Sequence, residues 1–135
     1  MKNERLAAID IGTNSIRCIV VEASKNGTYR ILDDEKETVR LGEGIASCGA
    51  ISNAAITRAE QAVSRMAKLV KGLGVKGVEA VATSAVRSAS NGPDLVARLE
   101  AILGVAIQVI SGEEEAGLAA QSALRNFDMQ GQRYG

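Results

Sequence analysis

The chain has 135 residues, of which 46% are hydrophobic and 24% charged, and this composition is typical of a single folded domain with a buried core. Sixteen basic residues balance sixteen acidic ones and aromatic residues make up only 2%, so the composition argues against nucleic acid or a membrane as a partner. The absence of histidine excludes Ser-His-Asp and Cys-His catalysis and most zinc sites within this sequence.

The cysteines and the N-terminus predict a cytoplasmic protein. Cys18 lies in a strand-like run and Cys48 in a glycine-rich loop, without the spacing of a metal site, which fits a reducing compartment. The first residues are charged, and the apolar run that follows is broken by Asp10, so we expect neither a signal peptide nor a membrane span.

The first part of the chain predicts three strands. Residues 6–11 and 15–23 are nearly continuous apolar runs, which are typical of strands covered on both faces. Lys25-Asn26-Gly27 predicts a hairpin turn, because Asn-Gly tolerates positive φ angles. Residues 28–39 are more polar and predict an edge strand that completes an antiparallel meander.

The rest of the chain predicts alternating helices and strands. Ser52 is the expected N-cap of a helix whose apolar positions recur every three or four residues, at Ile56, Ala59, Val63, Met66, Val70 and Leu73. The elements expected after it are a strand at 78–83, a helix at 93–103 opened by Pro93, a strand at 105–110, and a last helix capped by Ser111 and Glu114. The pattern therefore predicts an α/β fold in which the meander continues into parallel strand–helix units of one mixed sheet, with right-handed crossovers.

Residues 72–77 match the glycine spacing of a dinucleotide-binding turn. Here, however, the glycines follow a predicted helix and precede a strand, whereas the dinucleotide motif leaves a strand and opens a helix. They are expected to end one element and begin the next.

The turn between the first two strands is the clearest candidate site. Asp10 ends an apolar run, and Gly12, Thr13, Asn14 and Ser15 follow before the next run begins. The backbone N–H groups of residues 12–14 and the two hydroxyls suit phosphate, and a neighbouring carboxylate suits Mg²⁺. An ordinary β-turn would use the same residue types, so the turn alone leaves both interpretations open.

Two further segments leave the ends of predicted strands, at the sheet edge where α/β proteins bind ligands. Residues 82–91 carry Arg87 among small side chains. Residues 110–116 carry three consecutive glutamates at a helix start, where the helix dipole favours acidic residues. Glu113 and Glu114 fit structural roles there, whereas Glu115 lies past the capping position and is a candidate general base.

Four motifs in order resemble a known family. They are Asp-Ile-Gly-Thr-Asn-Ser-Ile-Arg at 10–17, Val-Arg-Leu-Gly-Glu-Gly at 39–44, Ala-Thr-Ser-Ala-Val-Arg at 82–87 and Ile-Ser-Gly-Glu-Glu-Glu-Ala at 110–116. From about Leu6 to about Leu124 the chain resembles the exopolyphosphatase / guanosine pentaphosphate phosphatase (Ppx/GppA) family. The resemblance implies a ribonuclease H-like lobe of the actin, sugar kinase and chaperone ATPase superfamily, with the active site between two such lobes.

The resemblance also implies roles for individual residues. Asp10 matches a carboxylate that works with Mg²⁺, and residues Gly12, Thr13, Asn14 and Ser15 match a phosphate loop. Arg87 matches an arginine that holds substrate phosphates, and Glu115 matches the catalytic base. Arg17 and Arg40 lie in matching segments but are not expected to be essential.

The sequence departs from the family in one respect. A second phosphate loop of Asp-Ile-Gly-Gly-Gly-Ser type, expected shortly after the last helix, does not occur before Gly135. Residues 1–135 are therefore expected to form one domain, the first lobe of a two-lobed phosphatase. By themselves they are expected to be inactive and to self-associate.

The function implied is Mg²⁺-assisted hydrolysis of the terminal phosphoanhydride of inorganic polyphosphate or guanosine pentaphosphate. The sequence does not choose between these two substrates, because both end in the same bond. Two alternatives stay open at this point: a superfamily kinase, and a module that binds these ligands without turnover.

Overall fold

The computed structural model describes residues 4–24, 28–83, 86 and 88–110. Its helices and strands, in chain order, are β1 (Glu4–Ile11), β2 (Ser15–Ala23), β3 (Tyr29–Thr38), α1 (Ile45–Cys48), α2 (Asn53–Gly72), β4 (Gly77–Thr83), α4 (Gly92–Leu103) and β5 (Ile107–Ile110).

The strands form one sheet in the order β3-β2-β1-β4-β5. β1, β2 and β3 pair antiparallel, whereas β1 pairs with β4, and β4 with β5, in parallel. The predicted meander and its continuation into parallel strand–helix units are therefore confirmed. The last predicted helix, from Ser111, and the turn at 25–27 lie outside the described residues.

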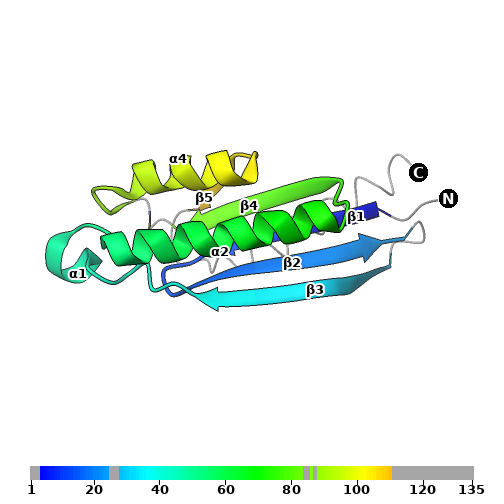
Figure 1. Cartoon of the computed structure of the whole chain (residues 1–135), viewed down its shortest axis with the longest axis horizontal. Helices are drawn as coiled ribbons and strands as arrows, with labels where there is room; N and C mark the ends of the chain where they lie inside the picture. The colour runs from blue at the N-terminus through cyan, green and yellow to red at the C-terminus, as the bar shows by residue number, and fades with distance from the viewer. Residues whose placement is uncertain (1–3, 25–27, 84–85, 87, 111–135) are drawn as a thin grey trace.

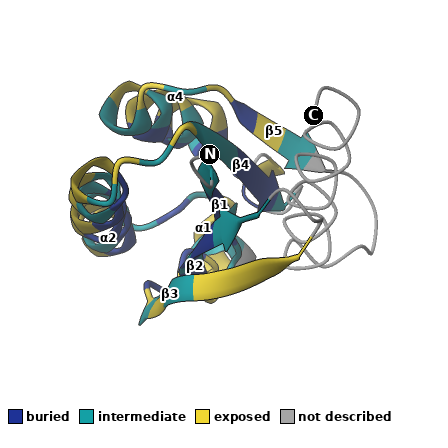
Figure 2. Cartoon of the chain, turned by 90° about the vertical axis from the view of Figure 1, so that its right-hand side faces the viewer, coloured by how far each residue is buried: buried dark blue, intermediate teal, exposed yellow. Residues whose placement is uncertain are grey.

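Helices α2 and α4 cover one face of this sheet (Figures 1 and 2). Alternate residues of the strands point toward them, such as Ile9 and Ile11 of β1 and Cys18 of β2, and these side chains are buried in the core. The predicted apolar face of α2 is confirmed, because Ala59, Val63, Met66 and Val70 are buried, while Ile56 and Leu73 pack partly buried against the same cluster.

The opposite face of the sheet is also buried along part of its length. Leu6, Ala8 and Val21 are at most 3% exposed, as expected for strands whose apolar runs do not alternate with polar residues. The edge strand β3 is mostly exposed (Figure 2), including Tyr29 at 47% and Ile31 at 60%.

The helix boundaries follow the predicted signals. The hydroxyl of Ser52 accepts a hydrogen bond from the N–H of Ala55 and caps α2, and Pro93 lies in the first turn of α4. The short helix α1 was not predicted. It lies between Gly44 and Gly49, whose positive φ angles of 90° and 71° limit the helix at both ends.

Residues 72–77 confirm the rejection of the dinucleotide motif. Helix α2 ends at Gly72, Gly74 has a φ of 66°, and β4 begins at Gly77. The glycines therefore connect a helix to a strand, and no helix N-terminus follows them to receive a pyrophosphate.

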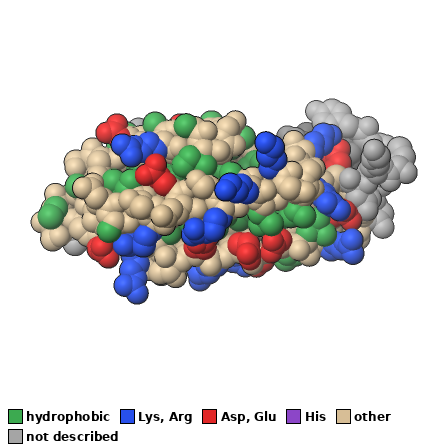
Figure 3. Space-filling view, in the orientation of Figure 1, with side chains coloured by type: hydrophobic (Ala, Val, Ile, Leu, Met, Phe, Trp, Pro, Cys, Tyr) green, Lys and Arg blue, Asp and Glu red, His purple; other side chains and the backbone are tan. Residues whose placement is uncertain are grey.

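Charges of both signs lie interspersed over the helix-covered face (Figure 3). Ion pairs connect α2 to its neighbours, with Arg65 bound to Glu37 of β3 and Glu60 bound to Arg98 of α4. Such exposed pairs contribute little individually, so the helices are held mainly by the apolar contacts beneath them.

The two cysteines differ in their exposure to solvent. Cys18 is fully buried, and loss of solvent raises the pKa of its thiol to about 12, so it packs as a small apolar residue as predicted. Cys48 is exposed. Among the described helices, none combines the length and the hydropathy needed to cross a bilayer.

Asn91 ties the start of α4 to the start of α2. Its side-chain oxygen accepts a hydrogen bond from the N–H of Ile51 at 2.8 Å, and its side-chain nitrogen donates to the carbonyl of the same residue at 2.9 Å. Ile51 is buried, so these bonds satisfy backbone groups that have limited access to water.

We therefore expect Asn91→Ala to lower the free energy of unfolding by about 1–3 kcal/mol, because it leaves a buried donor and a buried acceptor without partners. Asn53→Ala is the matched control, since Asn53 is exposed at the start of α2. Urea denaturation of both variants checks the prediction. Equal losses in the two variants would contradict the role given to Asn91.

Candidate functional site

The carboxyl ends of β1, β4 and β5 meet at one edge of the sheet. The parallel register places Asp10 beside Val81, and Thr83 beside Ile110. The three segments selected from the sequence therefore begin from adjacent strands. Their outer parts, including Arg87 and residues 111–116 with Glu113, Glu114 and Glu115, lie outside the described residues.

Asp10 lies on the face of the sheet opposite to the helices. Its neighbours Ile9 and Ile11 point into the helix-covered core, and Asp10 itself is half-buried, with its Oδ1 atom shielded from solvent. In the antiparallel register it lies directly across from Arg17 of β2, while Val81 of β4 lies on its other side. The carboxylate thus has a cationic neighbour on one side and an apolar neighbour on the other.

Arg17 is held in place by a carboxylate of the third strand. Its Nε and NH2 groups donate to the two oxygens of Asp34 at 2.8 and 2.6 Å. These bonds raise the pKa of Arg17 and the charge of Asp10 raises it further, while the bonds from Arg17 lower the pKa of Asp34. The result is a charged guanidinium held by Asp34, on the residue of β2 that pairs with Asp10.

Hydrogen bonds to its carbonyl groups hold the turn at residues 12–15 in place. The carbonyl of Thr13 accepts a hydrogen bond from the N–H of Gly42 at 2.9 Å. The carbonyl of Asn14 accepts two, from the N–H groups of Val39 and Arg40, also at 2.9 Å. Residues 39–42, which we call the anchor segment, therefore lie against the carbonyl side of the turn.

This anchoring sets the direction of the N–H groups. The C=O of Thr13 and the N–H of Asn14 belong to one planar trans peptide, so they point in opposite directions. The N–H of Asn14 therefore points away from the anchor segment. In the part of the chain that the structure describes, the N–H groups of Thr13 and Asn14 donate to no protein group.

Gly12 differs from the expectation that all three N–H groups are open. Its N–H donates to the carbonyl of Ser15 at 3.0 Å and closes the turn. A Cβ atom on Gly12 would lie 3.1 Å from the same carbonyl oxygen, which is closer than ordinary van der Waals contact and disfavours a side chain at this position. The hydroxyl of Ser15 is approached by the side-chain amide of Asn14 at 3.4 Å.

The donor set is compatible with a single magnesium ion. Within the described residues, no three acidic or cysteine side chains form a cluster that could enclose a metal. Mg²⁺ does not need such an enclosure, because it is commonly bound by one or two carboxylates together with water and substrate phosphates. Asp10, with a shielded oxygen at the sheet edge, fits the single-carboxylate case.

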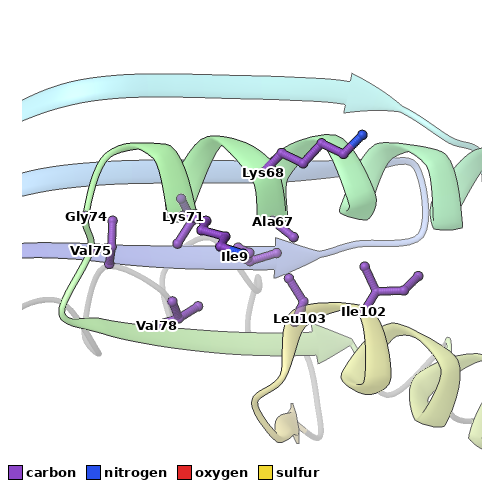
Figure 4. A pocket seen from close by; sticks show the side chains of 10 residues that line it. Ile9, Ala67, Lys68, Lys71, Gly74, Val75, Val78, Ile102 and Leu103 are labelled. Carbon is purple, nitrogen blue, oxygen red and sulfur yellow. The ribbon is translucent and has the colours of Figure 1, made fainter.

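A separate pocket of about 430 Å³ lies on the helix-covered face (Figure 4). It is lined mainly by apolar side chains of α2, the α2–β4 connection and the end of α4, including Val70, Val75, Val78 and Leu103. Its residues from the start of β4 place it toward the amino ends of the parallel strands. It is therefore not part of the site around Asp10.

Comparison with known proteins identifies the family. The model of the Ppx/GppA phosphatase family matches residues 19–134. The chain belongs to this family.

Solved structures agree with the match. The crystal structure of the Aquifex aeolicus family member has a TM-score of 0.78 and 29% identity over 82% of this chain and 36% of that one. An exopolyphosphatase from Cytophaga hutchinsonii has a TM-score of 0.74 and 31% identity over 81% of this chain and 35% of that one. The chain thus spans about a third of the length of these family structures.

A more distant structure shows the fold alone. The ethanolamine utilization protein EutJ from Carboxydothermus hydrogenoformans is 15% identical with a TM-score of 0.50, over 92% of this chain and 41% of that one. The mixed α/β sheet with strand–helix units expected from the sequence is therefore confirmed by the structure and matched by these neighbours.

Two glycine-to-alanine substitutions, one in the turn and one in the anchor segment, test how tightly the turn is packed. We expect Gly12→Ala to lower the free energy of unfolding by about 1–3 kcal/mol, because the new Cβ presses on a backbone oxygen that cannot move without breaking the turn. In Gly42→Ala the new Cβ meets Thr13 atoms at 3.8 and 3.9 Å, ordinary contact distances, so its effect should stay within about 0.5 kcal/mol. Denaturant unfolding measures both, and a stable Gly12→Ala variant would show that the turn is looser than described.

Proposed function

We propose that residues 1–135 form the first lobe of a two-lobed Ppx/GppA enzyme that hydrolyses the terminal phosphoanhydride of inorganic polyphosphate or guanosine pentaphosphate. The observation that carries this proposal is the anchored turn with two open N–H groups, next to Asp10 and Arg17, in a chain of this family. The Cytophaga hutchinsonii relative is described as an exopolyphosphatase, which supports the same class of substrate.

The turn would bind the phosphoryl group that is released. The N–H groups of Thr13 and Asn14 donate to its oxygens, with the hydroxyls of Thr13 and Ser15 nearby. Phosphoryl transfer needs positioning and charge neutralisation more than covalent help, so donors that are already oriented are well suited to it. Arg17 adds positive charge on the same side of the sheet as Asp10, a role that sequence reasoning did not assign to it.

Asp10 would hold Mg²⁺ together with substrate phosphate oxygens. The ion would supply charge neutralisation of those oxygens. Asp34 keeps Arg17 in its orientation, and the hydrogen bonds to Asp34 raise the pKa of Arg17, which favours its charged form.

Two residues outside the described part complete the proposal through the family resemblance. Arg87 would hold substrate phosphates, and Glu115 would accept the proton of the attacking water. The water oxygen bonds to the terminal phosphorus while the bridging P–O bond breaks and its electron pair leaves with the shortened chain. A general base on water favours hydrolysis over a kinase, because a kinase must exclude water from the transferred group.

Phosphate release tests the reaction class. The two-lobed protein that contains these residues should release phosphate from polyphosphate and from guanosine pentaphosphate in the presence of Mg²⁺, and should not transfer phosphate from ATP to a sugar. Transfer to sugar would support the kinase alternative. Tight binding of polyphosphate and guanosine pentaphosphate without release of phosphate would support a binding module.

Glu115 and Glu114 provide a matched pair for the base. We expect Glu115→Gln to lower the phosphate-release rate by about 10²–10⁴-fold with a modest effect on KM, as is typical when a general base is removed. Glu114→Gln should lower it far less, because a capping side chain acts on stability. Initial-rate kinetics of both variants measures the two losses of rate. An equal or larger loss in Glu114→Gln would show that Glu115 is not the base.

A further inference from the structure

Arg40 lies in the anchor segment, and its backbone is fixed to the turn. Its N–H donates to the carbonyl of Asn14 at 2.9 Å, and its own carbonyl accepts from the N–H of Glu43 at 3.1 Å. The residues on either side, Val39 and Leu41, are fully buried in the core, whereas Arg40 is exposed. The side chain of Arg40 therefore extends into solvent from a backbone held against the turn.

The backbone of Arg40 has an unfavourable conformation. Its φ angle is 53°, and in the part of the chain that the structure describes no other residue except glycine has a positive φ. A side chain in this left-handed region is disfavoured relative to glycine, and such conformations concentrate at ligand sites. An arginine at this position therefore calls for a reason beyond the turn itself.

Arg40 also differs from the other arginines in charge environment. Every other arginine that the structure describes has a carboxylate partner, namely Arg5, Arg17, Arg30, Arg58, Arg65 and Arg98. None of the described carboxylates pairs with Arg40. A guanidinium without a protein anion thus stands next to a turn whose N–H groups are open.

The backbone of Arg40 and the open N–H of Asn14 lie on opposite sides of the Thr13–Asn14 peptide. The carbonyls of Thr13 and Asn14 face the anchor segment that carries Arg40, whereas the N–H of Asn14 faces away from it. A phosphate bound by that N–H would therefore lie on the far side of the peptide from the backbone of Arg40. A ligand that carries several phosphates in a row could contact both the N–H of Asn14 and the guanidinium of Arg40.

We infer that Arg40 binds a non-terminal phosphate of a linear polyphosphate chain, and so raises affinity for long chains without taking part in bond cleavage. This inference rests on the proposed function. Guanidinium groups bind phosphate oxygens with two parallel hydrogen bonds, which suits a repeating polyanion. Arg40 is then a specificity-determining residue that favours polyphosphate over short phosphate esters.

The test compares substrates of different length in the two-lobed protein. Arg40→Gln should raise KM for long-chain polyphosphate about tenfold, as expected for the loss of a charge-assisted hydrogen bond, with kcat changed less than about twofold. KM for tripolyphosphate should stay the same. Arg40→Lys should recover part of the affinity, because it keeps the charge but loses the paired donors.

Two further variants separate binding from folding. Arg40→Gly should weaken long-chain binding as Arg40→Gln does, yet leave Tm unchanged or higher, because glycine accepts the positive φ. Arg98→Gln is the matched control, since Arg98 is exposed and paired with Glu60 in the helix layer, and it should change neither KM nor kcat.

The outcomes are distinct. Wild-type protein that releases no phosphate from any polyphosphate would refute the proposed function. Wild-type activity with an unchanged long-chain KM in Arg40→Gln and Arg40→Gly would refute only the role of Arg40. An equal rise of KM for tripolyphosphate would place Arg40 on the terminal phosphate and overturn the inference as stated.

Discussion

Three hydrogen bonds between the first turn and the anchor segment organise the candidate site. They join the carbonyls of Thr13 and Asn14 to the N–H groups of Val39, Arg40 and Gly42. Because the side chains of Val39 and Leu41 are buried in the core, the turn is connected through this segment to the packing beneath α2. A surface turn that would otherwise be mobile is thereby given one orientation, and the direction of its open N–H groups follows from it.

The register of the three antiparallel strands determines which charged residue lies next to Asp10. Arg17 lies on the same face as Asp10 because β1 and β2 pair with these residues opposite each other. A slip of one residue would move every side chain of β2 to the other face and would bury the guanidinium under the helices. The apolar residues of β2 that point into the core, such as Ile16 and Cys18, make such a slip unfavourable, so core packing also fixes the charge beside Asp10.

Sequence patterns predicted most of the fold because its strands and helices have strong periodicity and clear boundaries. Ser52 and Pro93 marked the helix starts correctly. The pairing of Arg17 with Asp34 was not predictable, because residues 33–37 are all charged and give no alternation from which to read a facing side. The positive φ of Arg40 was not predictable either, because sequence rules expect glycine or asparagine at such a position.

The candidate site was predictable in position but not in detail. Strand ends and turn residues located Asp10 and its loop, yet the sequence could not show that the N–H of Gly12 is used to close the turn. Nor could it show that Asn91, at the end of the second candidate segment, bonds to Ile51. Such details depend on contacts between residues far apart in the chain, which local propensity does not encode.

The arrangement also explains why a second lobe belongs in the proposed function. Asp10 and Arg17 point from the face of the sheet that α2 and α4 do not cover, and the open N–H groups of the turn lie at the same edge. Contacts from one side hold a phosphoryl group without fixing the angle of attack, and correct orientation can account for about 7–11 kcal/mol of a barrier. Groups that approach from the opposite side are needed to fix that angle and to exclude bulk water. Under the proposed function, this lobe orients and neutralises the phosphates, and closure against a second lobe completes the geometry for attack by water.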